Sequence, residues 1–184
     1  SGLLFNARSV RNKGLDLATS IASSTPPDIL ALTETWLKEH DSDAILGLPD
    51  DYLIFRKDRP SRGGGILTAV KANLHPVHHA EFDSPDLELL WVSLSCQRGR
   101  CLLGTLYRPP CATTSFWDDL NAVVSRMDHF LPKFDCIIFM GDFNIDCNPA
   151  VADSPNRSRL FELADSLNLF QLVTDITHPP CSDD

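Results

Sequence analysis

The sequence lacks the motifs of several common protein classes. Its six cysteines include no Cys-x-x-Cys pair, so a zinc site of the usual spacing is not expected. No Gly-x-Gly-x-x-Gly turn opens a helix and no Walker-type lysine is present, and the run Gly63 to Gly65 precedes a strand, which disfavours a nucleotide cradle. No apolar run approaches the roughly 20 residues that a membrane-spanning helix needs, so no membrane partner is expected.

Secretory features are also missing. The apolar piece from Ser1 to Asn6 has no basic region before it, which argues against a signal peptide. We therefore expect reduced cysteines and a nuclear or cytoplasmic location, and no secretion. One alternative concerns Cys96 and Cys101, which flank a plausible hairpin loop and could face each other across two strands.

Positive charge is scarce. The formal net charge is −9, which argues against binding nucleic acid by bulk charge alone. One local run is basic and is either a DNA-backbone contact or a solvated loop; it comprises Arg56, Lys57, Arg59 and Arg62.

The 184 residues, 43% of them hydrophobic, suffice for one sizeable core, so we expect a single domain over residues 1–184. Short apolar runs predict strands, and apolar residues at helical spacing predict helices. Strands outnumber helices and several are adjacent in the chain, which favours two sheets in one layered α/β or α+β domain and not a doubly wound parallel sheet. The expected strands are 3–5, 29–32, 52–55, 66–70, 87–94, 101–107, 136–140 and 169–173, and the expected helices are 13–23, 115–130 (capped by Thr114 or Ser115) and 156–167.

One stretch carries both a strand and polar groups at its end. Cys136 to Met140 form an unbroken apolar run, typical of a strand buried on both faces, and Gly141 ends it. Asp142 and Asn144 follow at alternate positions, where strand geometry would point them the same way. The pair is either part of a site or a loop that uses Asp and Asn for turn chemistry.

Further polar residues follow other predicted strands. If these strand ends meet on one rim, they form a carboxylate-containing cleft suited to phosphate chemistry, because Mg²⁺ takes oxygen ligands and a carboxylate can deprotonate an attacking water. Taken singly, each has a plainer interpretation as a turn residue, a solvated acid or a core aromatic. The set is Asn6, Glu34, Tyr107, Asp142 and Asn144.

Five motifs in order resemble the endonuclease/exonuclease/phosphatase superfamily. The motif sequences are most similar to those of the apurinic-endonuclease-like domain of LINE-type (non-LTR) retrotransposon polyproteins. The resemblance covers nearly the whole chain. The motifs are Phe5-Asn6-Ala7-Arg8-Ser9, Leu32-Thr33-Glu34-Thr35-Trp36, Arg62-Gly63-Gly64-Gly65, Leu106-Tyr107-Arg108-Pro109-Pro110 and Met140-Gly141-Asp142-Phe143-Asn144.

The resemblance implies a four-layer α/β sandwich with two packed mixed sheets and flanking helices. It also implies phosphodiester hydrolysis that depends on Mg²⁺, with Mn²⁺ as an alternative. The expected activity is nicking of DNA to leave a 3′-hydroxyl for target-primed reverse transcription, with a reverse-transcriptase domain in the same polyprotein as partner.

The resemblance also implies residue roles. Glu34 would bind the metal with Asn6 beside it, and Asp142 would activate the attacking water. Asn144 would orient Asp142 and the phosphate, and Tyr107 would contact the phosphate. Thr177 falls where the family has a DNA-contacting threonine.

The sequence departs from the family pattern near its end. A further Asp and a Ser-Asp-His motif are expected there, but the chain reads Ser182-Asp183-Asp184 with no His after it. We therefore expect a domain that is incomplete at its C-terminus, which leaves a catalytically incomplete fragment or remnant as an alternative. A second alternative is a superfamily phosphatase or phosphodiesterase that acts on phosphoinositide or sphingomyelin.

Overall fold

The computed structural model describes residues 1–11, 19, 25–97, 99–147 and 154–173. The chain divides into two compact units, Ser1–Asn144 and Ile145–Asp184. The single domain expected over residues 1–184 stays a prediction. Within the described ranges, no helix is long and apolar enough to cross a membrane.

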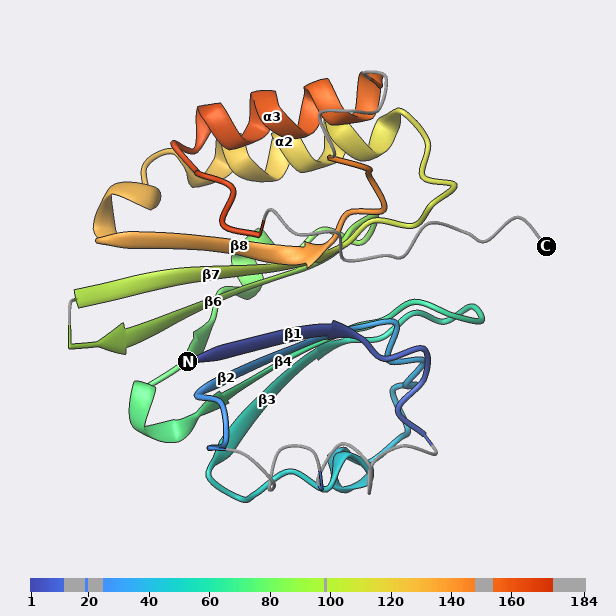
Figure 1. The fold of residues 1–184 in the computed structure, drawn as a ribbon, viewed down its shortest axis with the longest axis vertical. Coiled ribbons are helices and arrows are strands. Elements are labelled where there is room, and N and C mark those ends of the chain that lie inside the picture. Colours follow the sequence, from blue (N-terminus) through green and yellow to red (C-terminus); the bar gives the residue numbers. More distant parts are fainter. Residues whose placement is uncertain (12–18, 20–24, 98, 148–153, 174–184) are drawn as a thin grey trace. The chain divides into compact units, whose positions relative to one another are not determined.

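The first unit contains two four-stranded mixed sheets. Sheet A has the order β1-β2-β4-β3, in which β1 and β2 are parallel and the other neighbours are antiparallel (Figure 1). All five residues of β2 are buried, as its apolar run predicts. The strands of sheet A are β1 (Gly2–Asn6), β2 (Ile29–Thr33), β3 (Tyr52–Lys57) and β4 (Ile66–Lys71).

Sheet B has the order β5-β6-β7-β8, and only its last pair is parallel. Strands β6 and β7 form the predicted hairpin. Its register pairs Cys96 with Gly99 and Cys101 with Leu94, so the idea that Cys96 and Cys101 face each other is wrong, and both thiols are free. The strands of sheet B are β5 (Val77–His78), β6 (Glu88–Cys96), β7 (Gly99–Tyr107) and β8 (Cys136–Asp142).

The two sheets pack face to face (Figure 1). The apolar layer between them joins Ile29 and Val70 of sheet A to Val92 and Leu103 of sheet B. A buried hydrogen bond of 2.8 Å between the hydroxyls of Thr68 and Thr105 also crosses the interface. This arrangement confirms the predicted α/β fold with two packed mixed sheets.

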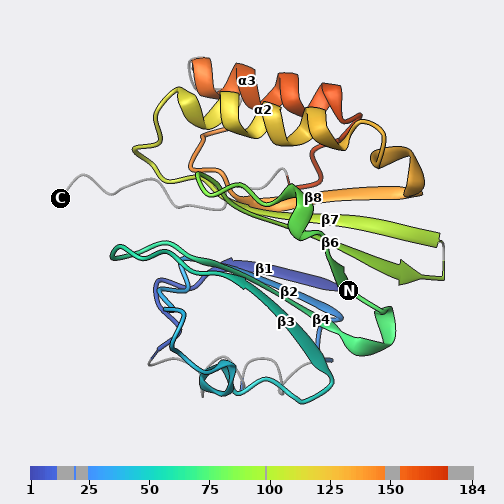
Figure 2. The ribbon, with the colours of Figure 1, turned by 180° about the vertical axis from the view of Figure 1, so that it is seen from behind.

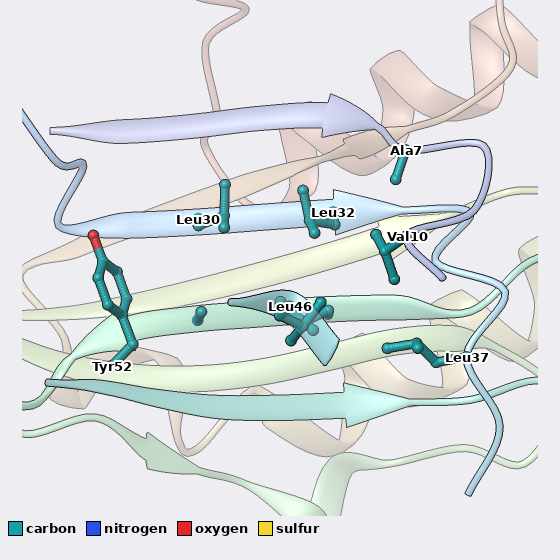
Figure 3. Close-up of a cluster of buried hydrophobic side chains, with 9 residues drawn as sticks. Ala7, Val10, Leu30, Leu32, Leu37, Leu46 and Tyr52 are labelled. Atoms are coloured by element: carbon teal, nitrogen blue, oxygen red, sulfur yellow. The ribbon is translucent and has the colours of Figure 1, made fainter. Parts of the chain in front are cut away.

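The outer face of each sheet is also covered. Helix α2 (Ser115–Met127) lies over sheet B (Figure 1, Figure 2) and buries Phe116, Trp117 and Leu120. Over sheet A, a second apolar cluster joins the strands to the short helix η1 (Asp43–Leu46) and the loops around it (Figure 3). The remaining 3-10 helices are η2 (Ala72–Leu74), η3 (Ala80–Phe82) and η4 (Leu131–Lys133).

Three predicted details of the first unit are wrong. Helix α2 ends at Met127 and not at Phe130, and the chain continues into η4, where Pro132 lacks the N–H that would extend the α-helical hydrogen bonds. The Thr114 side chain makes no capping bond. Strand β8 is at the edge of sheet B as described, so its residues are half-buried and Cys136 is exposed, whereas burial on both faces was predicted.

The second unit contains helix α3 (Pro155–Ser166), close to the predicted range, with the Ser154 hydroxyl accepting from the Arg157 N–H as an N-cap. No strand forms over residues 169–173, so that prediction is wrong. The helix predicted over residues 13–23 lies outside the described residues, apart from position 19.

Candidate active site at the carboxyl ends of four strands

Two parallel pairs of strands end at the same edge of the sandwich. Strands β1 and β2 of sheet A and β7 and β8 of sheet B run in one direction there (Figure 1). The residues at or just after their carboxyl ends are Asn6, Glu34, Tyr107 and Asp142. The structure therefore brings these four predicted side chains together from two different sheets.

Asn6 connects the two carboxylates of the site. Its Nδ2 lies 2.8 Å from Oε1 of Glu34 and 2.9 Å from Oδ2 of Asp142, so one amide group donates to both. Its Oδ1 accepts from the backbone N–H of Arg8 at 3.1 Å. The oxygen is thus directed to the β1 loop, and the amide nitrogen separates two negative charges that would otherwise repel each other.

Glu34 has a left-handed backbone conformation, with φ of 53°. Such a conformation is unfavourable for a residue with a long side chain, and surrounding hydrogen bonds hold it. The Glu34 carbonyl accepts from the N–H of Ser9 at 2.8 Å, and the next N–H, of Thr35, donates to the carbonyl of Gly65 at 3.1 Å. The loops after β1 and before β4 therefore fix the direction of the Glu34 side chain.

Tyr107 donates its hydroxyl to Oε1 of Glu34 at 3.2 Å. Its side chain is buried, and burial raises the pKa of the phenol, with the nearby charge of Glu34 adding to the effect. The hydroxyl therefore stays protonated at neutral pH and remains a hydrogen-bond donor.

Asp142 begins a tight turn at the end of β8. The N–H of Asn144 donates to Oδ1 of Asp142 at 3.1 Å, and Asn144 has φ of 48°. The Asn144 side-chain amide donates to the carbonyl of Arg108 at 2.8 Å. Asn144 thus contacts Asp142 through its backbone, and its side chain ties the turn to the end of β7.

The glycine before Asp142 allows a close approach of β7 and β8. A Cβ at Gly141 would lie 1.9 Å from the carbonyl oxygen of Leu106, which excludes every other residue without movement of the backbone. Of the two uses of glycine at the end of a strand, a turn or a close approach of another backbone, Gly141 serves the close approach.

Two residues of this region were not singled out as site residues. Glu88, at the start of β6, accepts from the N–H of Gly65 and pairs with Arg59 at 2.9 Å. Burial raises the pKa of Glu88. Arg108 is buried beneath the turn that Asp142 begins. Neither residue is an isolated polar residue at the end of an apolar run, so the pattern that predicts the other site residues does not point to them. Thr177 lies outside the described residues.

The donor set fits a hard divalent cation. Glu34 and Asp142 present carboxylate oxygens on one rim, and Mg²⁺ commonly uses one or two protein carboxylates with water and phosphate as further ligands. The predicted metal ligands were Glu34 and Asn6. The Asn6 side chain directs its amide nitrogen, which cannot bind a cation, towards the carboxylates, so Glu34 is the better-placed ligand of the two. Among the described residues, no three His, Cys, Asp or Glu side chains gather as a ligand group.

The predicted basic run is largely neutralised within the protein. Arg56 pairs with Asp43 and Asp58, and Arg59 pairs with Glu88. The Lys57 ammonium donates to the carbonyl of Ser84, and burial lowers its pKa. Arg62 is the one member of the run for which the described residues offer no such partner.

Arg62 lines a cleft of about 290 Å³. The other walls come from the loops after β1 and β2 and from the glycine run, and they contribute two more cations. The lining residues are Arg11, Trp36, Lys38, Pro60, Arg62 and Gly63. Arg11 pairs with Asp41 at 2.6 Å and the Lys38 ammonium donates to backbone carbonyls of residues 59–61, so Arg62 is the cation of this cleft without such a partner among the described residues. Trp36 is two residues from Glu34 in the chain.

A model of the endonuclease/exonuclease/phosphatase family matches residues 3–182. The solved structures similar to this chain include the endonuclease domain of TRAS1, a telomere-specific non-LTR retrotransposon (18% identity, TM-score 0.68, 90% of this chain and 71% of that one). Others are the 3′ phosphatase NExo from Neisseria bound to a product DNA hairpin (18%, 0.59, 89% and 70%) and an AP endonuclease from Archaeoglobus fulgidus (18%, 0.57, 88% and 70%). No curated protein sequence matches the chain.

Proposed function

Because the chain belongs to the endonuclease/exonuclease/phosphatase family, we propose that it hydrolyses phosphodiester bonds in DNA with a divalent metal, Mg²⁺ or Mn²⁺. We further propose that it nicks one strand and leaves a 3′-hydroxyl that primes reverse transcription. The observation that carries the proposal is the Asn6 amide, which holds Glu34 and Asp142 on one rim beside the Tyr107 hydroxyl.

The side chains divide the chemistry among them. Asp142 accepts the proton of the attacking water, since its Oδ1 and Oδ2 are held by N–H donors that leave lone pairs free. Tyr107 stays protonated and donates to a phosphoryl oxygen as negative charge develops there. Glu34 would hold the metal, which when bound neutralises charge on the phosphoryl oxygens.

Asn144 and Thr177 complete the proposed contacts with substrate. The Asn144 amide nitrogen is engaged by the Arg108 carbonyl, so this residue orients Asp142 through the turn and offers its Oδ1 to water or the DNA strand. Thr177 would contact DNA, as the family resemblance implies.

The proposed cellular setting is that of a mobile element. The motif sequences and the fold shared with the TRAS1 endonuclease domain support a retrotransposon origin. Such an origin implies a reverse-transcriptase domain in the same parent polypeptide. Work on DNA implies a nuclear or cytoplasmic location. The described cysteines are free, in keeping with a reducing compartment.

The test is nicking of supercoiled plasmid with Mg²⁺, with Mn²⁺ and with EDTA. Two proteins are assayed: this chain of 184 residues and, where the reading frame continues, the longer polypeptide that contains it. Asp142→Ala should abolish nicking while DNA binding is retained, and Asp118→Ala, an exposed acid of α2, serves as the matched control. Unchanged nicking by Asp142→Ala would refute the assignment of the base.

The same assay separates the alternatives. Turnover only by the longer polypeptide would identify the 184 residues as a catalytically incomplete piece. When catalytic groups act as a unit, the loss of one of them removes most of the rate. Release of phosphate or phosphocholine from phosphoinositide or sphingomyelin, without DNA nicking, would place the chain in another branch of the family.

A further inference from the structure

Arg108 is a buried cation next to the site. It directly follows Tyr107, and only 2% of its surface is exposed. Charged side chains are rarely buried so completely unless they are paired. Among the described residues, no carboxylate forms an ion pair with Arg108, and its Nε has no hydrogen-bond partner. Something other than an ion pair therefore accounts for its position.

The guanidinium of Arg108 lies between helix α2 and the turn that begins at Asp142. Its central carbon is 5.7 Å from the ring centroid of Phe116 and 6.0 Å from that of Trp117. Its Nη1 lies 3.4 Å from the carbonyl oxygen of Phe143 and 3.5 Å from that of Asn144. Aromatic faces and carbonyl oxygens are both electron-rich, so these groups offset the buried positive charge.

The backbone of Arg108 is joined to the same turn. Its N–H donates to the carbonyl of Asp142 at 2.9 Å, and its carbonyl accepts from the Asn144 amide at 2.8 Å. The turn is therefore held at its first residue, its middle and its last residue by the one amino acid that directly follows β7. The side-chain part of this attachment is the part that a substitution can remove.

We propose that Arg108 is a positioning residue that fixes the turn from Asp142 to Asn144 against helix α2, so that the Asp142 carboxylate points at the attacking water. This inference rests on the proposed function. A planar guanidinium can stack on two rings and donate along its edge at the same time. A lysine ammonium is a point charge on a flexible stem and cannot reproduce both contacts.

The left-handed conformation of Asn144 makes the turn sensitive to this support. A non-glycine residue at φ of 48° persists only where surrounding contacts hold it. Without the guanidinium, the carbonyls of Phe143 and Asn144 lose their buried donor, and the turn can relax. A displacement of about 1 Å at a catalytic group can cost about 100-fold in rate.

The experiment compares Arg108→Met and Arg108→Lys with the unchanged chain. Arg108→Met should lower kcat for plasmid nicking by about 100-fold with KM changed less than about 3-fold, because the reacting group moves while the DNA surface does not. Arg108→Lys should recover part of kcat. Amide hydrogen exchange over residues 141–144 should accelerate about 10-fold or more in Arg108→Met and remain slow at the start of β8.

Val123→Ala is the matched control, since Val123 is buried on the same helix but is not one of the α2 residues, Phe116 and Trp117, whose rings hold the guanidinium. It should lower the melting temperature and leave kcat and exchange at the turn unchanged. Arg108→Met that behaves like Val123→Ala in both readouts would overturn the proposal. If Arg108→Met does not fold, the same comparison is made with Arg108→Lys. If the unchanged chain does not nick DNA, the proposed function fails, while exchange at residues 141–144 still decides the role of Arg108.

Discussion

The side-chain amide nitrogen of Asn6 lies 2.9 Å from a carboxylate oxygen of Asp142, although 136 positions separate them in the chain. Asn6 ends β1 in sheet A and Asp142 ends β8 in sheet B. The bond therefore joins the two sheets at the rim where the carboxylates meet. Because Glu34 directly follows β2 of the first sheet and Asp142 ends β8 of the second, the packing of the sheets sets the distance between the two acids.

Replacing Asn6 with aspartate should destabilise the protein in a way that cations reverse. The variant places a third carboxylate between Glu34 and Asp142. We therefore expect the free energy of unfolding to fall by about 1–3 kcal/mol at pH 7. Millimolar Mg²⁺ should raise the melting temperature of Asn6→Asp more than that of the unchanged chain. Asn121→Asp, on the exposed face of α2, adds the same charge elsewhere and should show neither effect. Equal shifts in both variants would contradict the prediction.

Removal of the Tyr107 hydroxyl should affect catalysis more than folding. Tyr107→Phe keeps the buried ring and removes the donor to Glu34, so kcat for nicking should fall by about 100-fold. The only other tyrosine, Tyr52, donates its buried hydroxyl to the carbonyl of Pro27 far from the rim. Tyr52→Phe should cost about 1 kcal/mol in urea denaturation and leave kcat unchanged. Similar kcat values for the two variants would remove Tyr107 from the site.

Most strands could be read from the sequence because apolar runs and their Gly or Pro boundaries act locally. The gathering of Asn6, Glu34, Tyr107 and Asp142 on one rim could be predicted because these residues follow strands and lie in motifs of characteristic order. What failed depended on partners distant in the chain. The run Leu169 to Val173 is apolar except for Gln171, but a strand needs a neighbour to pair with, and none pairs with it in the described structure.

The same reason explains why Glu88 and Arg108 were missed. Glu88 meets Gly65 and Arg59 only after β6 has packed beside the glycine loop. Arg108 stands in a recognisable motif, yet its burial arises from Phe116 and Trp117 of α2, which no spacing along the chain connects to it. The register of the β6–β7 hairpin likewise depended on where the turn falls.

The basic cleft should contribute to DNA binding in a salt-dependent way. Arg62→Glu removes a cation that has no partner among the described residues and should weaken binding to every DNA sequence alike. The slope of log K against log salt should fall in magnitude by about 1. Arg126→Glu on α2 makes the same change of charge on an exposed helix face and is the control. An unchanged slope in Arg62→Glu would exclude the cleft from the DNA path.

Gly104 of β7 should not tolerate a side chain. A Cβ there would lie 2.5 Å from the ring of Phe139 and 2.6 Å from that of Trp91, and these two rings stack at 5.4 Å. Gly104→Ala should therefore lower the free energy of unfolding by about 1–3 kcal/mol through overpacking. At Gly2 the nearest atom to an added Cβ is 3.9 Å away, so Gly2→Ala should be nearly neutral. Urea denaturation measures both, and equal stabilities would disprove the clash.

The largely buried carboxyl of Glu88 should make the free energy of unfolding fall as pH rises. Its pKa in the folded protein is raised above 4.5, first by burial. Well below pH 4.5 the carboxyl is protonated in both the folded and the unfolded chain, so its ionisation does not affect the free energy of unfolding. As pH increases, the unfolded chain ionises first, which favours unfolding until pH passes the folded pKa. Glu88→Gln cannot ionise but keeps an oxygen to accept from the N–H of Gly65.

The relevant quantity is the stability of the unchanged chain minus that of Glu88→Gln, measured by urea denaturation from pH 4 to pH 8. We expect this difference to decrease as pH rises above 4.5 and then to level off. Other titrating groups are common to both proteins and cancel. The ion pair with Arg59 opposes the effect of burial, so a difference that instead increased with pH would mean that Arg59 outweighs desolvation at Glu88.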